Sequence, residues 1–153
     1  MDVAMAVLGA VLVTYGWYWA GVTESRTTAY AMGAGAIMLG LGFAFGGGSP
    51  LIALGAIFAL LGTMNAWNES SQDRTYGMFA LLLAVIALLA YGNDDGLGYG
   101  VLALGAIAAL HFVSAALVPA NKGFKALIGW ATLFAGAVIV FVALEDFTGI
   151  AIG

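Results

Sequence analysis

The sequence contains no cysteine and very little charge. Of its 153 residues, only 8% are charged, and Lys and Arg number four. Without cysteine the chain can form no disulfide, zinc–thiolate cluster or thiol nucleophile. A water-soluble domain carries roughly a quarter charged residues, so the composition excludes that class. With 63% hydrophobic residues and a mean hydropathy of +1.06, the composition also excludes a disordered chain. The net charge of −4 argues against binding nucleic acid.

What the sequence does contain is a succession of long apolar runs. They cover approximately residues 3–22, 28–46, 50–67, 76–91, 98–118 and 124–144. A membrane-spanning helix needs about 20 such residues, and the absence of alternation favours helices over barrel strands. The sequence therefore predicts an all-α membrane protein, with residues 1–153 forming a single bundle of six transmembrane helices. No basic segment precedes the first run, so we expect a retained helix and not a cleaved signal peptide.

The few charges predict an orientation. Six crossings place both termini and the loops 46–49 and 92–97 on one side of the membrane. The basic residues all fall in or beside the loops on the other side: Arg26, Arg74, Lys122 and Lys125. The first side carries acids alone: Asp2, Asp94, Asp95, Glu145 and Asp146. By the positive-inside rule the basic loops are cytoplasmic. We expect a multi-pass protein of the cell membrane, plasma or inner, with both termini outside.

The six runs divide into three helix hairpins, each with a turn that carries basic residues. The first two turns, 24–27 and 69–75, resemble each other, which fits either an internal repeat or chance.

Small residues recur along the runs at four-residue steps: Gly16 and Ala20, Ala29 and Gly33, Ala36 and Gly40, Gly55 and Ala59, Gly105 and Ala109. Such faces let membrane helices approach closely. We expect tight packing, with some faces left for neighbouring subunits.

Polar residues inside the apolar runs are the candidate functional residues, because they are costly in lipid. His111 either lines a pore and senses pH or forms a hydrogen bond within the bundle. Asn65 and Thr63 end the third run, where they line a vestibule or cap and link helices. Tyr15 and Trp19 share one helix face, and either line a narrow path or belong to an interfacial aromatic belt.

Several functions are disfavoured by what these runs lack. They contain no mid-membrane carboxylate for proton coupling and no Asp, Glu and His set for a catalytic metal. His111 and Ser114 share a helix face, but no residue is placed to orient the histidine, so we expect no enzyme and no cofactor. An uncharged interior suits a neutral solute better than an ion, which needs rings of carbonyls or charges.

Three short motifs carry a family resemblance. Gly21, Thr23 and Arg26 form the first turn, Asn65 precedes a loop ending in Asp73-Arg74-Thr75-Tyr76, and Lys122-Gly123-Phe124 opens the last run. This layout resembles the AmiS/UreI family of amide and acid-activated urea channels. The resemblance implies six spans with both termini outside, and a hexameric ring of protomers that each contain a pore. It also implies passive passage of urea or a short-chain amide.

The sequence departs from the family pattern in places that affect the expected pore. Where the family has a glutamate in the last helix, residues 128–135 offer only Thr132. The fifth-helix tryptophans are missing, with His111 nearby, and the third-helix aromatics are reduced to Phe58. The outer loops lack histidine, so we expect no acid gating there. The candidate pore-lining residues are Tyr15, Trp19, Phe58, Thr63, Asn65, His111 and Thr132. Two alternatives remain: a weak-acid or metabolite transporter, and an accessory membrane subunit without transport.

Overall fold

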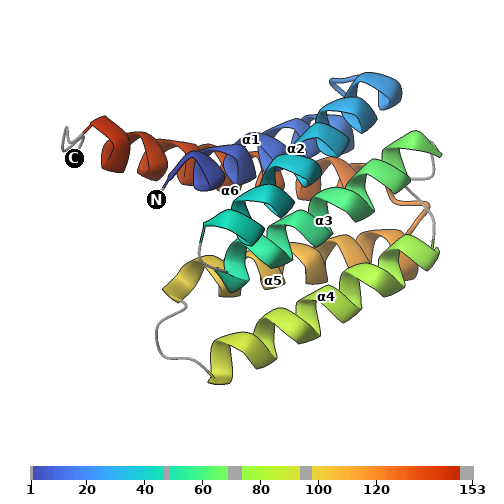
Figure 1. Ribbon diagram of the computed structural model, residues 1–153. Coiled ribbons are helices and arrows are strands. Elements are labelled where there is room, and N and C mark those ends of the chain that lie inside the picture. The colour runs from blue at the N-terminus through green and yellow to red at the C-terminus, as the bar shows by residue number, and fades with distance from the viewer. Residues whose placement is uncertain (1, 47–48, 69–73, 94–97, 149–153) are drawn as a thin grey trace.

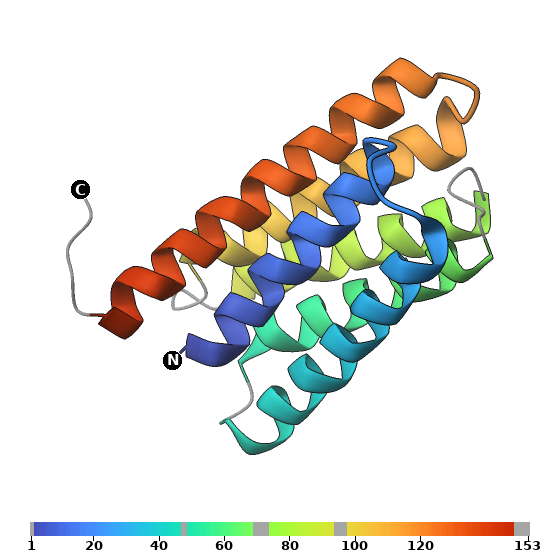
Figure 2. The same cartoon turned by 90° about the horizontal axis from the view of Figure 1, so that it is seen from above.

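The fold is a bundle of helices. The computed structural model describes residues 2–46, 49–68, 74–93 and 98–148, and every regular element within these ranges is helical. The elements are α1 (Asp2–Trp19), α2 (Ser25–Phe45), α3 (Pro50–Trp67), α4 (Arg74–Asn93), α5 (Gly98–Phe112), the π-helix η1 (Val113–Leu117) and α6 (Lys122–Thr148). Successive long helices run in opposite directions through the bundle (Figures 1 and 2).

Five helical segments, α2 to α6, are long and apolar enough to cross a membrane. The segment of α5 reaches this length because it continues through η1 to Leu117. The apolar part of α1, Val3–Trp19, is shorter. At 1.5 Å per residue it covers about 26 Å, slightly less than the roughly 30 Å hydrocarbon core. The fold is thus that of a multi-pass helical membrane protein, and a sixth crossing by α1 remains a prediction.

The first helix ends three residues before the predicted boundary at residue 22, and Gly21 gives the reason. Gly21 has φ of +83°, a conformation that glycine adopts without steric cost. Its N–H donates to the Tyr18 carbonyl at 3.1 Å, and the Val22 N–H donates to the Trp17 carbonyl at 2.9 Å. These two bonds form a Schellman motif, which closes α1 just after Trp19.

The run predicted as one helix over 98–118 changes its hydrogen-bond pattern at Val113. The N–H of Val118 donates to the Val113 carbonyl at 3.1 Å, five residues back, as a π-helix requires. Pro119 follows and cannot continue the ladder. Short π-helical turns occur often at functional sites, and η1 begins two residues after His111.

The most extensive contacts join α1 with α6, α2 with α3, and α4 with α5. The hairpins expected across the basic turns, α1–α2, α3–α4 and α5–α6, do make contacts, but less extensive ones. In Figure 2, α1 lies along α6, so the first and last helices close the bundle. Hydrophobicity alone does not choose neighbours in lipid, so the apolar runs could not predict this pairing.

Two pairs of glycines join α1 to α6. A Cβ added to Gly9 would lie 2.7 Å from the Gly136 carbonyl oxygen, and one added to Gly136 would lie 2.6 Å from the Gly9 oxygen. Gly16 and Gly129 have the same reciprocal relation, with 2.6 and 2.8 Å. Only glycine leaves room for backbones at this separation. The small face predicted at Gly16 is therefore an internal contact surface.

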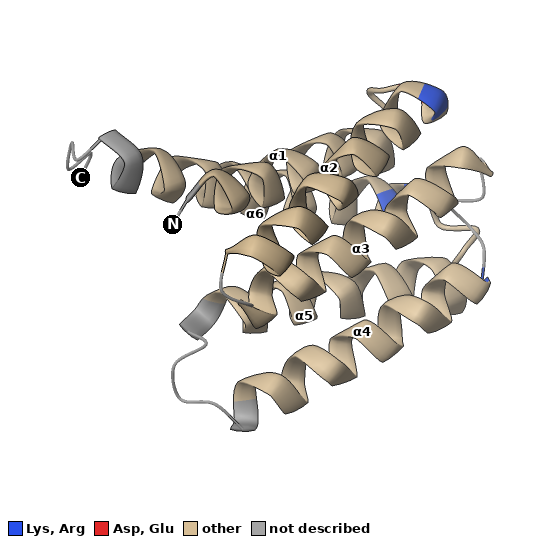
Figure 3. Cartoon of the chain, viewed as in Figure 1, with Lys and Arg blue, Asp and Glu red and all other residues tan. Residues whose placement is uncertain are grey.

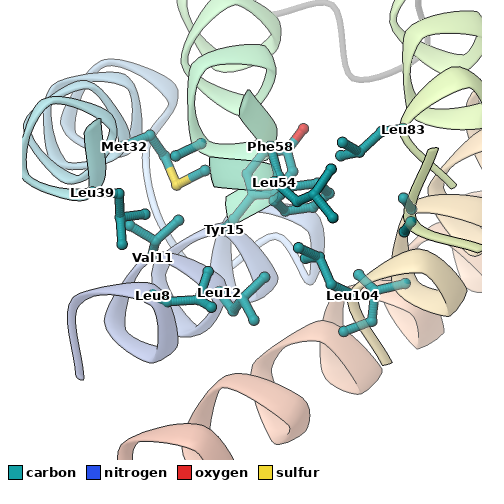
Figure 4. Packing of buried hydrophobic residues seen from close by; sticks show 14 of the residues in the cluster. Leu8, Val11, Leu12, Tyr15, Met32, Leu39, Leu54, Phe58, Leu83 and Leu104 are labelled. Carbon is teal, nitrogen blue, oxygen red and sulfur yellow. The ribbon is translucent and has the colours of Figure 1, made fainter. Parts of the chain in front are cut away.

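The core is filled by large apolar side chains from all six of the α-helices, α1 to α6. Figure 4 shows Leu8, Leu12 and Tyr15 of α1 facing Phe58 of α3 and Leu104 of α5. All of these side chains are buried. They occupy the space between the helices, and Tyr15 and Phe58 also belong to the polar and aromatic group described below.

The basic residues lie toward one end of the bundle. Arg26, Arg74, Lys122 and Lys125 belong to the first turns of α2, α4 and α6, which all begin at the same end (Figure 3). This is the segregation that the charge pattern predicts, while the side of the membrane that this end faces remains a prediction. The acidic side chains expected at the opposite end lie outside the described residues, as does the turn 69–73 used to infer a repeat.

Candidate functional site

A group of aromatic and polar side chains is buried at the centre of the bundle, toward its basic end. We define this central cluster as Tyr15, Trp19, Phe58, Asn65, Tyr76, His111 and Thr132. They come from α1, α3, α4, α5 and α6, and each is at most 6% exposed. Six of them were predicted as candidates from the sequence, and the fold brings those six together with Tyr76.

His111 is the centre of this cluster, and aromatic rings surround it. The Tyr15 ring stacks on the imidazole at 5.3 Å between centroids, with an interplanar angle of 8°. Trp19 lies edge-on at 4.1 Å, and Phe58 lies edge-on at 5.5 Å. The histidine is fully buried, so its two ring nitrogens depend on protein partners.

His111 and its partners form a chain of hydrogen bonds in which each group donates to the next. The Thr132 hydroxyl donates to the Ile128 carbonyl at 2.8 Å, which uses its only proton. Thr132 Oγ1 must therefore accept from His111 Nε2, 3.0 Å away. In a neutral imidazole Nδ1 is then the unprotonated nitrogen, and it accepts from the Tyr76 hydroxyl at 3.1 Å. The geometry thus places a proton of His111 on Nε2.

A second hydrogen bond crosses from α1 to α3. The Tyr15 hydroxyl donates to Asn65 Oδ1 at 2.8 Å, and both side chains are buried. Gly62 permits this approach, because a Cβ there would lie 3.3 Å from Tyr15 Cζ and still closer to Met32. Asn65, predicted to line a vestibule or link helices, does link α3 to α1.

Tyr76 is the member of the cluster that was not among the predicted candidates. It lies in the first turn of α4, beside Gly77, where a Cβ would meet the Ala116 Cβ at 2.9 Å and the Ala116 nitrogen at 3.1 Å. Gly77 therefore lets α4 lie against η1, which brings the Tyr76 hydroxyl to His111. The signal that could have found it is a tyrosine–glycine pair at the start of an apolar run.

Trp19 differs from its neighbours in its hydrogen bonding. Its indole Nε1 is buried and makes no hydrogen bond of ordinary geometry, the only such side-chain atom among the described residues, although it interacts with the nearby Tyr15 hydroxyl. Lys125 Nζ lies 5.6 Å from the Trp19 ring centroid and 5.7 Å from that of Tyr18, within the range of cation–π attraction. Trp19 also lies beside Tyr76, 6.0 Å between ring centroids.

Thr63 is the one predicted candidate that lies apart from the cluster. Its hydroxyl donates to the Ala59 carbonyl of its own helix at 2.8 Å. Its methyl group faces α2, 3.5 Å from the position that a Cβ on Gly33 would take. Ser114, considered with His111, is buried on η1, whereas both bonds described for the histidine go to Tyr76 and Thr132.

A small pocket leads toward the cluster from the basic end. Its volume is about 70 Å³, and it is lined by Leu61, Met64, Asn65, Asn68, Thr75, Tyr76 and Phe79. Two of these residues, Asn65 and Tyr76, belong to the central cluster as well. The pocket lies where α3 ends and α4 begins, and it is large enough for one or two water molecules.

The fold and the cluster together define the class: a multi-pass helical membrane bundle with a buried polar and aromatic centre. Comparison of the chain with protein-family models, with curated proteins and with solved structures gave no match.

Proposed function

We propose that the protein is a passive membrane channel for a small neutral polar solute, urea or a short-chain amide, without gating by its outer loops. The observation that carries the proposal is the central cluster, where hydroxyl, amide and imidazole groups lie buried beside a pocket that opens toward the basic end. Polar groups are expensive within a membrane and usually mark a solute pathway. We infer that the cluster is the constriction of that pathway.

The chemistry of the cluster suits neutral solutes. It contains aromatic faces, hydroxyls and an amide, and none of its members is an acid or a permanent cation. A planar amide can pass between ring faces while exchanging hydrogen bonds with such groups. An ion would have to leave its hydration shell without a replacement. The motif resemblance to the amide and urea channels supports the same solute class.

The wider assembly follows from the same resemblance. We propose six crossings with basic loops in the cytoplasm, and a homo-oligomer, hexameric by resemblance, in which each protomer has its own pathway. A broad apolar groove between α2 and α3 supports the oligomer, because Gly33, Ala36 and Ala56 allow close approach there. This is the kind of small-residue face through which membrane helices associate.

The close packing of the core supports a second candidate, an accessory subunit without transport. Tyr15 and His111 are fully buried, and Phe58 is 1% exposed, so these side chains fill the bundle centre. The third candidate, a weak-acid transporter, requires uptake that depends on a pH gradient.

Proteoliposome experiments separate these candidates. Stopped-flow light scattering after mixing with urea or acetamide should show faster swelling than in protein-free vesicles, with sucrose as an impermeant control. Equal rates with and without protein would contradict the channel and favour the accessory subunit. Uptake that appears only with an imposed pH gradient would favour the weak-acid transporter. A Phe134→Leu protein, altered at an exposed residue, controls for reconstitution efficiency.

A further inference from the structure

We propose that the Trp19 indole N–H is a binding site for the carbonyl oxygen of the permeating solute, and that this contact selects solutes by their acceptor strength. The inference rests on the proposed channel function and names the atom that recognises the solute. It begins from the one buried side-chain polar atom that makes no hydrogen bond of ordinary geometry among the described residues, Trp19 Nε1.

An inventory of donors singles out this group. The other hydroxyl and ring N–H donors of the cluster are used within the protein, on Tyr15, Tyr76, His111 and Thr132. Each of those protons has one acceptor in the directed scheme described above. The Trp19 N–H alone makes no hydrogen bond of ordinary geometry, although it lies close enough to the Tyr15 hydroxyl to interact with it. An indole can donate but cannot accept. A buried donor without an acceptor is unfavourable, so the site favours a ligand that brings an acceptor.

The position of Trp19 fits a site on the pathway. Its ring contacts His111, with 4.1 Å between centroids, and lies beside Tyr76, which lines the pocket at the basic end. The indole therefore lies next to a residue that lines the pocket.

Lys125 adds a second, independent observation. Its ammonium group lies 5.6 Å from the Trp19 ring centroid. A cation over an indole draws electron density from the ring, which makes the N–H a stronger donor. The same positive charge attracts the oxygen end of an amide dipole and repels cationic solutes such as guanidinium. Both effects orient a solute with its carbonyl oxygen toward Trp19.

The solute class that meets these requirements is a small planar molecule with one strong carbonyl acceptor and no positive charge. Urea and acetamide qualify. Their sulfur analogues, thiourea and thioacetamide, have nearly the same shape but a weak acceptor, because sulfur accepts hydrogen bonds poorly. Comparing urea with thiourea, and acetamide with thioacetamide, therefore distinguishes recognition of the acceptor atom from selection by solute size.

The first test compares permeation in proteoliposomes for the natural protein, Trp19→Phe and Trp17→Phe. Trp17 lies on the same helix but is exposed, so its variant is the matched control. We expect the natural protein to prefer urea over thiourea, and Trp19→Phe to reduce urea permeation about three- to tenfold, the value of one hydrogen bond. The urea-to-thiourea ratio should then fall toward one, while Trp17→Phe keeps the original ratio.

The outcomes distinguish the two proposals. If the natural protein passes none of these solutes faster than empty vesicles, the channel function fails. If it passes urea but Trp19→Phe leaves the urea-to-thiourea ratio unchanged, the channel stands and the Trp19 site is wrong.

A spectroscopic test does not depend on transport or on the folding of Trp19→Phe. The chain has four tryptophans, and Trp17, Trp67 and Trp130 are exposed. Replacing these three with Phe leaves Trp19 as the only indole, whose N–H hydrogen bonding ultraviolet resonance Raman spectroscopy reports. We expect a free N–H signature that shifts to a bonded one as acetamide is added, with a smaller shift for thioacetamide. A signature that is bonded from the start and insensitive to acetamide would overturn the proposal.

Discussion

Gly16 on α1 and Gly129 on α6 touch backbone to backbone. A Cβ on either residue would lie within 2.8 Å of the other's carbonyl oxygen. The contact holds α1 at a fixed height along α6, and Trp19 follows Gly16 by one helical turn. The same contact therefore determines where Trp19 lies relative to Lys125, which is also on α6.

We predict that Gly16→Ala or Gly129→Ala destabilises the protein by about 1–3 kcal/mol, because the added methyl group meets backbone atoms that cannot rotate away. Thermal unfolding in detergent, followed by helical circular dichroism, measures the effect. Gly40→Ala is the matched control, since a Cβ there has no atom within 4 Å. If Gly16→Ala unfolds at the same temperature as Gly40→Ala, the predicted backbone contact is wrong.

The tautomer of His111 provides a second prediction. Because Thr132 donates to a backbone carbonyl, His111 should carry a proton on Nε2, and because the ring is fully buried it should be neutral at pH 7. Nitrogen-15 NMR of protein labelled at histidine can establish this, and the assignment is unambiguous because the chain has one histidine. Resonances of an Nδ1–H tautomer or of an imidazolium would contradict the directed series of hydrogen bonds.

Gly77 should control the contact between Tyr76 and His111. Gly77→Ala places a methyl group against Ala116 of η1, so the start of α4 must move away. We expect a loss of about 1–3 kcal/mol in unfolding free energy. We also expect a changed His111 Nδ1 resonance, because the 3.1 Å bond from Tyr76 lengthens. Tyr76→Phe, which removes the same bond, should shift that resonance in the same direction, whereas Gly40→Ala should leave it in place.

The predicted six crossings can be tested with single cysteines, since the natural chain has none to interfere. We choose Val3, in the first turn of α1, and Val22, just after its end, and Ser49 and Asn68 to flank α3. With a membrane-impermeant maleimide on intact cells, Val3→Cys and Ser49→Cys should react. Val22→Cys and Asn68→Cys should react only after permeabilisation. Reaction of Val3→Cys and Val22→Cys from the same side would show that α1 does not cross.

The sequence predicted the helices well for a physical reason. A backbone within lipid must satisfy its own hydrogen bonds, so each long apolar run has little choice but to form a helix. The predicted run 50–67 coincides with α3, and most other boundaries differ by a few residues. Two of the differences have a local backbone cause, at Gly21 and at the π-turn that begins at Val113.

The arrangement of the helices was not predictable in the same way. Glycine and alanine recur on many faces, and nothing in their spacing indicates that Gly16 meets Gly129 while Gly40 meets no atom. The candidate polar residues were found because polarity is rare in these runs. Tyr76 was missed because it sits at the end of a run, where a tyrosine usually belongs to the interfacial belt.

The pairing of α1 with α6 affects how the protein is made. During synthesis α1 is made long before α6. The glycine face of α1, with Tyr15 and Trp19, therefore lacks its final contacts until α6 has been synthesised. The contacts of His111 with Trp19 and Thr132 can form together only when α6 arrives. Assembly of the central cluster is therefore a late event, and a ribosome-arrested chain that ends before α6 should contain helices but no completed centre.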